Sequence, residues 1–442
     1  MLNRSEHREA NERIVTFLDI GTSKICCMIV ALPRRLAGPH RIGQPLPGRV
    51  LGFGYGPSKG IKAGLVVDLT EAEQAIRSAV DRAEERAGIH VEQVVVSVTA
   101  GRLRSTTFSA SADVGRRTVA EADIARALAA GRAFAERDGR TLLHMHRLGY
   151  RLDAETGIRN PRGMTGERLS VDLNAVTADD PPLRNLVLLV ERCFLSVAAM
   201  IATPYASALS VMTADEAQLG VTVIDMGAGA TTVALFAEGQ FIHADAVAIG
   251  GSHISFDIAR ALSTPLHVAE RIKTFYGNLV GAASDEHELI PYSIVGEDDG
   301  LRYHTSKARI RRIIRPRIEE TLEVVAERLL KSGCADYSGG RVVLTGGAAQ
   351  LAGLPEFAQQ VLGRTVRVAA PRPFGDLPES ATTPPFATVH GLGHALITPG
   401  IVAGAIAESA SGAPSRGYLG QVTRWFMESF WDDDRQGESH RR

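Results

Sequence analysis

Two segments of this chain, about half a chain apart, share one pattern. Each is an apolar strand that ends at an aspartate, followed by a tight turn of small residues and a second apolar strand. The first segment covers residues 17–30 with Asp19, and the second covers residues 223–236 with Asp225. A single hairpin of this kind is ordinary β structure. Two copies predict two related α/β domains that face each other and offer both turns to one ligand.

The residue types in the two turns indicate the ligand. Glycine, serine and threonine turns present backbone N–H groups and hydroxyls to phosphate oxygens, and a carboxylate can hold a hydrated Mg²⁺. We therefore expect ATP and Mg²⁺, with Asp19 and Asp225 holding the metal through water. Lys24 is a further candidate, with solvent contact alone as the alternative. The predicted phosphate contacts are Gly21, Thr22, Ser23, Gly227, Gly229 and Thr231.

Three later features fit the same nucleotide. Gly250 and Gly251 open a predicted helix, whose first N–H groups would be free for an anion. Glu270 and Lys273 are three residues apart, so they share a helical face and could reach a ribose or base. Gly346 and Gly347 follow a predicted strand and let backbone approach a nucleoside closely. Each glycine turn alone is more often structural, but the set predicts a nucleotide site. The P-loop pattern Gly-x-x-x-x-Gly-Lys-[Ser/Thr] is absent from the sequence.

Composition limits the other possibilities. The 442 residues suffice for two or three domains, and a net charge of −1 gives no reason to expect a nucleic-acid partner. His144 and His146 lack a third nearby ligand, so we expect an exposed strand alternation rather than a metal site. The four cysteines lack metal-ligand spacing, and the N-terminus lacks the apolar core of a signal peptide. We expect a cytoplasmic protein.

The pattern along the chain predicts the domain organisation. A helix is expected over 69–87, with a capping box at Thr70 and Glu73, and another over 317–331. The predicted divisions are a first domain core (14–89 and 174–209), an inserted β-rich subdomain (90–173), a second domain core (210–239 and 316–400), a subdomain within it (240–315) and a linker (401–417).

These motifs resemble the actin, Hsp70 and sugar-kinase superfamily and, within it, the FtsA family of bacterial cell-division proteins. The resemblance rests on residues 18–24, 160–164, 215–227, 269–273 and 344–349. It implies a duplicated, ribonuclease H-like, actin-like ATPase fold of the α/β class with an inserted β-rich subdomain. It also implies an adaptor that forms actin-like filaments, tethers FtsZ to the inner membrane at the division site and recruits later division proteins. Residues 240–315 correspond to the partner-binding subdomain of that family.

The chain departs from the superfamily pattern in two places. Ala228 and Ala230 replace a glycine and a threonine of the second turn, so one phosphate-directed hydroxyl is missing unless Thr231 supplies it. Hsp70-like members place a glutamate before the segment that starts at Pro204, whereas this chain has Thr203. Orienting water is a large part of hydrolytic catalysis. We therefore expect tight ATP binding with weak or negligible hydrolysis.

The C-terminal segment 418–431 has the pattern of an amphipathic helix. It contains both tryptophans of the chain, and at 1.5 Å per residue it would be about 20 Å long, too short to cross a bilayer. We expect it to lie in the surface of the inner membrane, although the run Asp432 to Asp434 should weaken attraction to anionic lipid. A helix docked back on the core is the alternative. The residues expected to enter the lipid are Tyr418, Leu419, Val422, Trp425, Phe426, Phe430 and Trp431.

Two other functions remain open at this point. A small-molecule kinase of the same superfamily would need a catalytic aspartate facing the γ-phosphate, and the sequence offers no such motif. A pilus-assembly adaptor related to the FtsA family would be expected to lack the terminal amphipathic helix.

Overall fold

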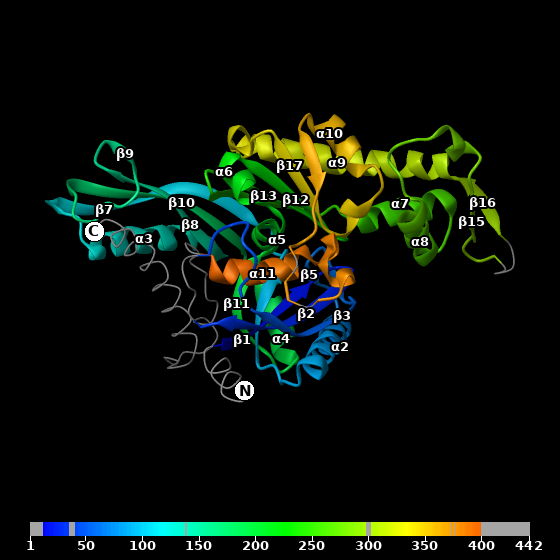
Figure 1. Ribbon diagram of the computed structural model, residues 1–442, viewed down its shortest axis with the longest axis horizontal. Helices are drawn as coiled ribbons and strands as arrows, with labels where there is room; N and C mark the ends of the chain where they lie inside the picture. Colours follow the sequence, from blue (N-terminus) through cyan, green and yellow to red (C-terminus); the bar gives the residue numbers. More distant parts are fainter. Residues whose placement is uncertain are drawn as a thin grey trace, which may run out of the picture.

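The computed structural model describes residues 12–34, 40–137, 139–297, 302–372, 374–375 and 377–398. Figure 1 shows two sheet-centred domains stacked on each other, with a further subdomain at either end of the upper one. Among the described residues, no helix is both long and apolar enough to cross a bilayer. The predicted linker 401–417 and amphipathic helix 418–431 lie outside the described residues.

The first domain is built on a five-stranded sheet with the order β11-β6-β1-β2-β3. Strands β1, β2 and β3 pair with one another in antiparallel fashion. Strand β6 lies parallel to β1, and β11 lies parallel to β6. The strand interiors are buried almost continuously, which is expected for a sheet covered on both faces. The strands are β1 (Glu12–Ile20), β2 (Lys24–Pro33), β3 (Arg49–Pro57), β6 (Gln93–Val98) and β11 (Ser196–Ala202).

The second domain repeats this arrangement, with the order β14-β13-β12-β17-β18. Strands β12, β13 and β14 are antiparallel, and β17 and β18 are parallel to β12. The matching strand orders confirm the predicted duplication of an α/β domain. The strands are β12 (Val221–Met226), β13 (Thr231–Ala237), β14 (Gln240–Val247), β17 (Arg341–Thr345) and β18 (Thr365–Val368).

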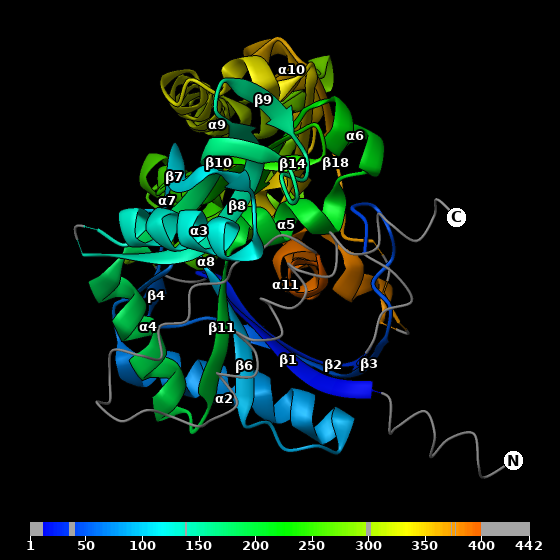
Figure 2. The ribbon, with the colours of Figure 1, turned by 90° about the vertical axis from the view of Figure 1, so that its left-hand side faces the viewer.

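Two helices separate the sheets. Every residue of α5 (Thr203–Val211) and of α11 (Ala387–Ile397) is buried. Figure 2 shows α11 end-on between the two domains, while α2 (Leu69–Ala87) and α4 (Asp180–Arg192) cover the other face of the first sheet. The predicted helix over 69–87 is confirmed, but its cap is Asp68, which accepts from two backbone N–H groups at 2.9 Å, rather than Thr70.

The insert is a four-stranded sheet, β7-β10-β8-β9, with α3 packed on one face. The expected start at residue 90 is wrong, because β6 pairs with β1 and β11 in the first domain, so the insert begins after Val98. His144 and His146 are buried rather than exposed. The elements are β7 (Arg104–Thr118), α3 (Glu121–Ala135), β8 (Arg140–Leu152), β9 (Glu155–Ile158) and β10 (Thr165–Asp179).

The subdomain at the other end of the molecule contains α7, α8, a two-stranded sheet and the start of α9. Two predicted boundaries differ here. Strand β14 belongs to the second sheet, and α9 starts at Lys307 behind the Ser306 cap, so residue 316 falls inside this helix. The elements are α7 (Gly251–Leu262), α8 (Leu266–Tyr276), β15 (Leu289–Tyr292), β16 (Tyr303–Ser306) and α9 (Lys307–Lys331).

Short elements complete the described chain. They are β4 (Ile61–Lys62), β5 (Leu65–Val66), α6 (Ala214–Leu219), α10 (Leu354–Leu362) and the 3-10 turns η1 (Ala283–Glu286), η2 (Ala335–Ser338), η3 (Gly347–Gln350), η4 (Glu379–Thr382) and η5 (Pro384–Phe386).

Candidate functional site

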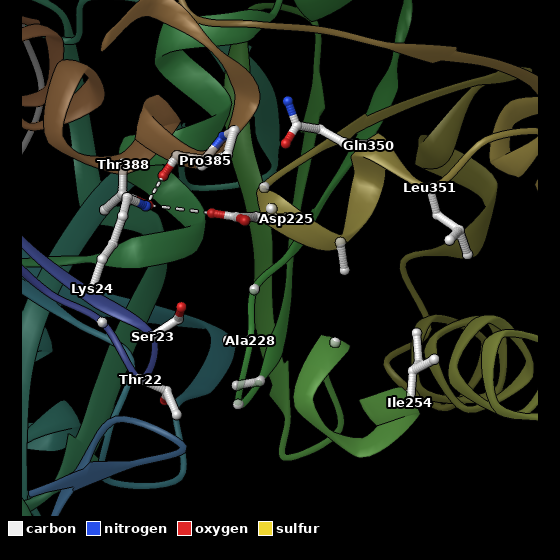
Figure 3. Close-up of a pocket in the computed structure, with 18 of the residues that line it drawn as sticks. Thr22, Ser23, Lys24, Asp225, Ala228, Ile254, Gln350, Leu351, Pro385 and Thr388 are labelled. Atoms are coloured by element: carbon white, nitrogen blue, oxygen red, sulfur yellow. Dashed lines mark hydrogen bonds between the residues drawn. The ribbon is translucent and has the colours of Figure 1, made fainter. Parts of the chain in front are cut away.

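A cavity of about 440 Å³ lies between the two domains, where β1 and β12 end. Figure 3 shows its lining, to which both hairpins, α7 and η3 contribute. The cavity brings together thirteen of the fifteen residues predicted to bind nucleotide. They are Asp19, Gly21, Thr22, Ser23, Lys24, Asp225, Gly227, Gly229, Gly251, Glu270, Lys273, Gly346 and Gly347.

The two hairpin turns meet across this cavity. Each is closed by one backbone hydrogen bond, from Gly21 N to Lys24 O (3.1 Å) and from Gly227 N to Ala230 O (3.0 Å). A Cβ added to Gly229 would lie 2.4 Å from the hydroxyl oxygen of Thr22. The threonine of the first turn therefore contacts the backbone of the second, so one small ligand can touch both.

Asp19 is buried at the end of β1. The hydroxyl of Ser97 donates to its Oδ1 at 2.7 Å. Burial raises the pKa of Asp19 above its ordinary value, and the positive charge of Lys24 and the Ser97 hydrogen bond oppose that shift.

Asp225 occupies the matching position at the end of β12. Burial, and then the negative charge of Asp19, raise its pKa to about 6. The hydroxyl of Thr388 donates to Oδ2 at 3.2 Å. Gly346 approaches from the other side with φ +89°, and a Cβ there would lie 2.3 Å from Oδ1 of Asp225. Glycine is thus required at this position for two reasons, the left-handed backbone and the close approach.

Lys24 reaches into the cavity rather than only into solvent. Its ammonium donates to the carbonyl of Pro385, as Figure 3 shows, and lies 4.7 Å from the centre of the Phe386 ring. Its charge also lowers the pKa values of both aspartates. Lys24 therefore supplies positive charge beside two carboxylates whose charged forms are disfavoured by burial.

These features fit a hydrated Mg²⁺ and a polyphosphate. A nearby cation would stabilise the charged forms of these two buried carboxylates, whose pKa values are raised. Carboxylate oxygens are also the ligands that Mg²⁺ prefers. The described residues hold no cluster of three or more metal-ligating side chains.

The predicted role of the Gly250 and Gly251 amides is wrong. Gly251 N donates to the carbonyl of Gly227 at 2.9 Å, and Ser252 N donates to Ala228 at 2.8 Å. Gly250 does not line the cavity, and its N–H donates to the ring of His253. The backbone N–H groups at the start of α7 therefore bond to the carbonyls of the second hairpin, and these bonds hold that hairpin against the helix.

Thr231 is also not a phosphate contact. Its side chain is fully buried, and its hydroxyl donates to the carbonyl of Ile249 at 2.7 Å, away from the cavity lining. It cannot replace the hydroxyl lost at Ala230. The next residue, Thr232, lines the cavity instead.

Glu270 and Lys273 share one face of α8, and their charged groups are 2.8 Å apart. Ser255 also donates to Glu270, and Lys273 donates to the carbonyl of Gly251 at 3.1 Å. Both charged side chains are thereby held at the cavity wall.

Thr203 lines the cavity at the start of α5, and its hydroxyl lies 2.7 Å from that of Thr99. Among the described lining residues, the carboxylates are Asp19, Asp225 and Glu270. None of them belongs to α5. The place where Hsp70-like members carry a glutamate thus holds a hydroxyl.

Several lining or supporting residues were missed from the sequence. Ser97 and Thr388 bind the two aspartates, and Pro385 binds Lys24. Ser97 is the last residue but one of β6, the strand beside β1, which is a weak signal. Pro385 belongs to η5 and Thr388 to α11, and the sequence offered no amphipathic pattern for either element.

Comparison with known proteins agrees with this architecture. The family model described as "Cell division protein FtsA" matches residues 222–391, and the model "SHS2 domain inserted in FTSA" matches residues 100–177. The Cell division protein FtsA of Rhizobium meliloti (strain 1021) is 42% identical over 429 residues, which cover 94% of this chain and 95% of that protein. The FtsA of Neisseria meningitidis serogroup B is 32% identical, with 96% and 100% covered.

Among solved structures, a chain of the "PilM-PilN type IV pilus biogenesis complex" is similar, with a TM-score of 0.61. The two sequences are 18% identical, and the match covers 87% of this chain and 99% of the pilus chain, so the likeness concerns the fold alone. The match to the family model of the inserted domain, and the sequence identity to FtsA proteins over nearly the whole chain, decide the family. This chain has an actin-like fold with an inserted domain, and it belongs to the FtsA family of cell division proteins.

Proposed function

We propose that this FtsA-family protein binds ATP with Mg²⁺ between its two domains, assembles into actin-like filaments and tethers FtsZ to the inner membrane, where later division proteins join. The observation that carries the nucleotide part is the pair of buried aspartates, Asp19 and Asp225, on facing glycine turns. Their raised pKa values and the adjacent Lys24 support a site for a metal-bound polyphosphate. Glu270 and Lys273 would bind the ribose or base.

Calorimetry with ATP, in the presence of Mg²⁺ or EDTA, tests this assignment. The unchanged protein should bind ATP more tightly with Mg²⁺, and Asp19→Asn and Asp225→Asn should abolish the difference. Asp81→Asn is the matched control, because Asp81 is an exposed aspartate of α2 outside the cavity. Equal affinity with and without Mg²⁺ in the unchanged protein would contradict the proposed metal site.

We also propose that hydrolysis is weak or negligible. The support is Thr203, whose hydroxyl pairs with Thr99 where a water-orienting carboxylate would be needed. Phosphate release by the purified protein measures the rate. A turnover of about one per second or faster, which is an ordinary enzymatic rate, would contradict this part of the proposal.

Membrane attachment is proposed for residues 418–431, on the sequence pattern alone. Binding of one tail would be reversible, and several tails on one filament would bind far more firmly. Liposome co-sedimentation should be lost when residues after Gly417 are removed, and also in Trp425→Glu. Gln421→Ala, on the opposite face of the expected helix, should leave it unchanged. Unchanged sedimentation of the truncated protein would refute attachment through this segment.

Division is favoured over the two other functions by the FtsA relatives and by the match of the inserted domain. We propose the subdomain formed by α7, α8, β15, β16 and the start of α9 as the surface for FtsZ. A fluorescent fusion should form a ring at mid-cell. Polar foci would favour the pilus-assembly adaptor, and diffuse signal would favour a small-molecule kinase.

A further inference from the structure

A histidine of the insert makes an unusual contact with the first domain. His144 lies on β8 with 0% of its surface exposed, and its Nε2 accepts a hydrogen bond of 2.8 Å from the backbone N–H of Ala202. An accepting Nε2 requires the neutral ring with its proton on Nδ1. Burial favours this form, because it holds the pKa of His144 well below its ordinary value.

The contact falls beside the cavity. Ala202 is the last residue of β11, and the next residue, Thr203, starts α5 and lines the cavity. Thr203 in turn meets Thr99, which follows the neighbouring strand β6, with 2.7 Å between the two hydroxyl oxygens. The insert is therefore hydrogen-bonded to Ala202, the residue directly before the cavity-lining Thr203.

The rest of α5 is held in a way that transmits this contact. Arg372 donates to the carbonyls of Leu209 and Met212 at 2.7 and 2.5 Å, which fixes the C-terminal end of the helix to the second domain. Tyr205 packs against both His146 of the insert and Phe241 of β14, with its ring centre 5.0 and 4.8 Å from theirs, and those two rings also contact each other. The wholly buried helix α5 is therefore in contact with the insert near its start and with Arg372 at its end.

We propose that His144 is a positioning residue for the ATP site: through Ala202 it sets the place of Thr203, and so couples the placement of the insert to nucleotide binding. This inference rests on the proposed ATP site. Coupling of this kind is reciprocal, so a partner that shifts the insert would change ATP affinity by the same factor as ATP changes the affinity for that partner.

Three variants separate this role from simple packing. His144→Phe keeps a ring but removes the acceptor, and His144→Gln can restore an acceptor near the position of Nε2. Tyr150→Phe is the matched control, because Tyr150 is buried on the same strand and its hydroxyl accepts a hydrogen bond of 3.0 Å from Arg147 within the insert. The readouts are the calorimetric affinity for ATP with Mg²⁺, the melting temperature without nucleotide and the hydrogen-exchange rate of the Ala202 amide.

We expect His144→Phe to bind ATP about fivefold more weakly, as befits one hydrogen bond, and to exchange the Ala202 amide faster. His144→Gln should recover both properties. Tyr150→Phe should keep the affinity even where its melting temperature falls as much. If His144→Phe does not fold, His144→Asn replaces it, because the shorter amide cannot reach the position of Nε2.

Two outcomes would overturn the inference. Equal ATP affinity in the unchanged protein and the His144 variants would overturn it alone and leave the proposed function in place. Absence of ATP binding by the unchanged protein would overturn the proposed function and this inference together.

Discussion

The hydroxyl of Ser97 links two neighbouring strands at the proposed metal site: it donates to Oδ1 of Asp19 at 2.7 Å and accepts from the backbone N–H of Ile20 at 3.3 Å. A hydroxyl that donates one hydrogen bond and accepts another has a fixed orientation, and the carboxylate that accepts from it is oriented as well. Asp19 is therefore aimed before any cation arrives, which lowers the cost of binding one.

Ser97→Ala should weaken binding of ATP with Mg²⁺ by about tenfold or more. A hydrogen bond to a charged group contributes about 1.5–3 kcal/mol, and its loss also raises the pKa of Asp19 further. Calorimetry measures the change. Ser109→Ala is the control, because Ser109 also donates to an aspartate, Asp172, but in the insert. Unchanged affinity in Ser97→Ala would show that Asp19 needs no orienting partner.

Asp225→Asn should stabilise the nucleotide-free protein at about pH 7.5. The pKa of Asp225 is about 6 in the folded chain, against an ordinary value of 3.8, so the folded state disfavours the charged form. The resulting destabilisation is fully present above pH 6 and disappears as the pH falls towards 3.8. It amounts to roughly 3 kcal/mol at most, and we expect the variant to gain about 1–3 kcal/mol.

Urea unfolding without nucleotide or Mg²⁺ tests this prediction at about pH 7.5 and about pH 4.5. The gain in the free energy of unfolding should shrink at the lower pH. Asp81→Asn, at an exposed position, should show no such dependence. A variant less stable than the unchanged protein at both values would mean that the hydrogen bonds of Asp225 outweigh the cost of its charge.

The paired hairpins and the duplicated domain could be predicted because their signal is local. An aspartate at the end of an apolar strand, followed by small residues, specifies its own turn, and two copies identify the symmetry. Residues such as Glu270 and Lys273 were also found locally, since helical spacing alone puts them on one face.

The misses have one physical cause, which is contact between segments far apart in the chain. Gly251 looked like a free anion site because its partner, the carbonyl of Gly227, lies 24 residues earlier. His144 and His146 looked exposed because strand alternation does not say what covers a face. Helix α11 carries apolar residues all round, so it lacks the periodicity that identifies a half-buried helix.

Gly391→Ala should destabilise the protein strongly. A Cβ at Gly391 of α11 would lie 1.8 Å from the carbonyl oxygen of Ala206 in α5, so the two central helices would have to separate. Overpacking of this kind costs about 1–3 kcal/mol or more. Thermal melting measures it. Gly340→Ala is the control, since a Cβ there meets no atom within 4 Å. An unchanged melting temperature would show that the helix pair can shift freely.

Lys24→Gln should raise the pKa of Asp225 above about 6 and weaken binding of ATP with Mg²⁺. The positive charge of Lys24 lowers the pKa values of both aspartates, and its ammonium also ties the first hairpin to the turn before α11 through Pro385. The pH dependence of unfolding without nucleotide reports the first effect, and calorimetry reports the second.

Two further variants separate charge from the tie to Pro385. Lys24→Arg keeps the charge and should retain most of the affinity, and Lys62→Gln, at an exposed lysine outside the cavity lining, should behave as the unchanged protein. If Lys24→Gln and Lys24→Arg lose affinity equally, the geometry of the Pro385 contact matters and the charge does not. If only Lys24→Gln loses affinity, the ammonium acts through its charge, which offsets the two carboxylates until a metal-bound nucleotide takes over that role.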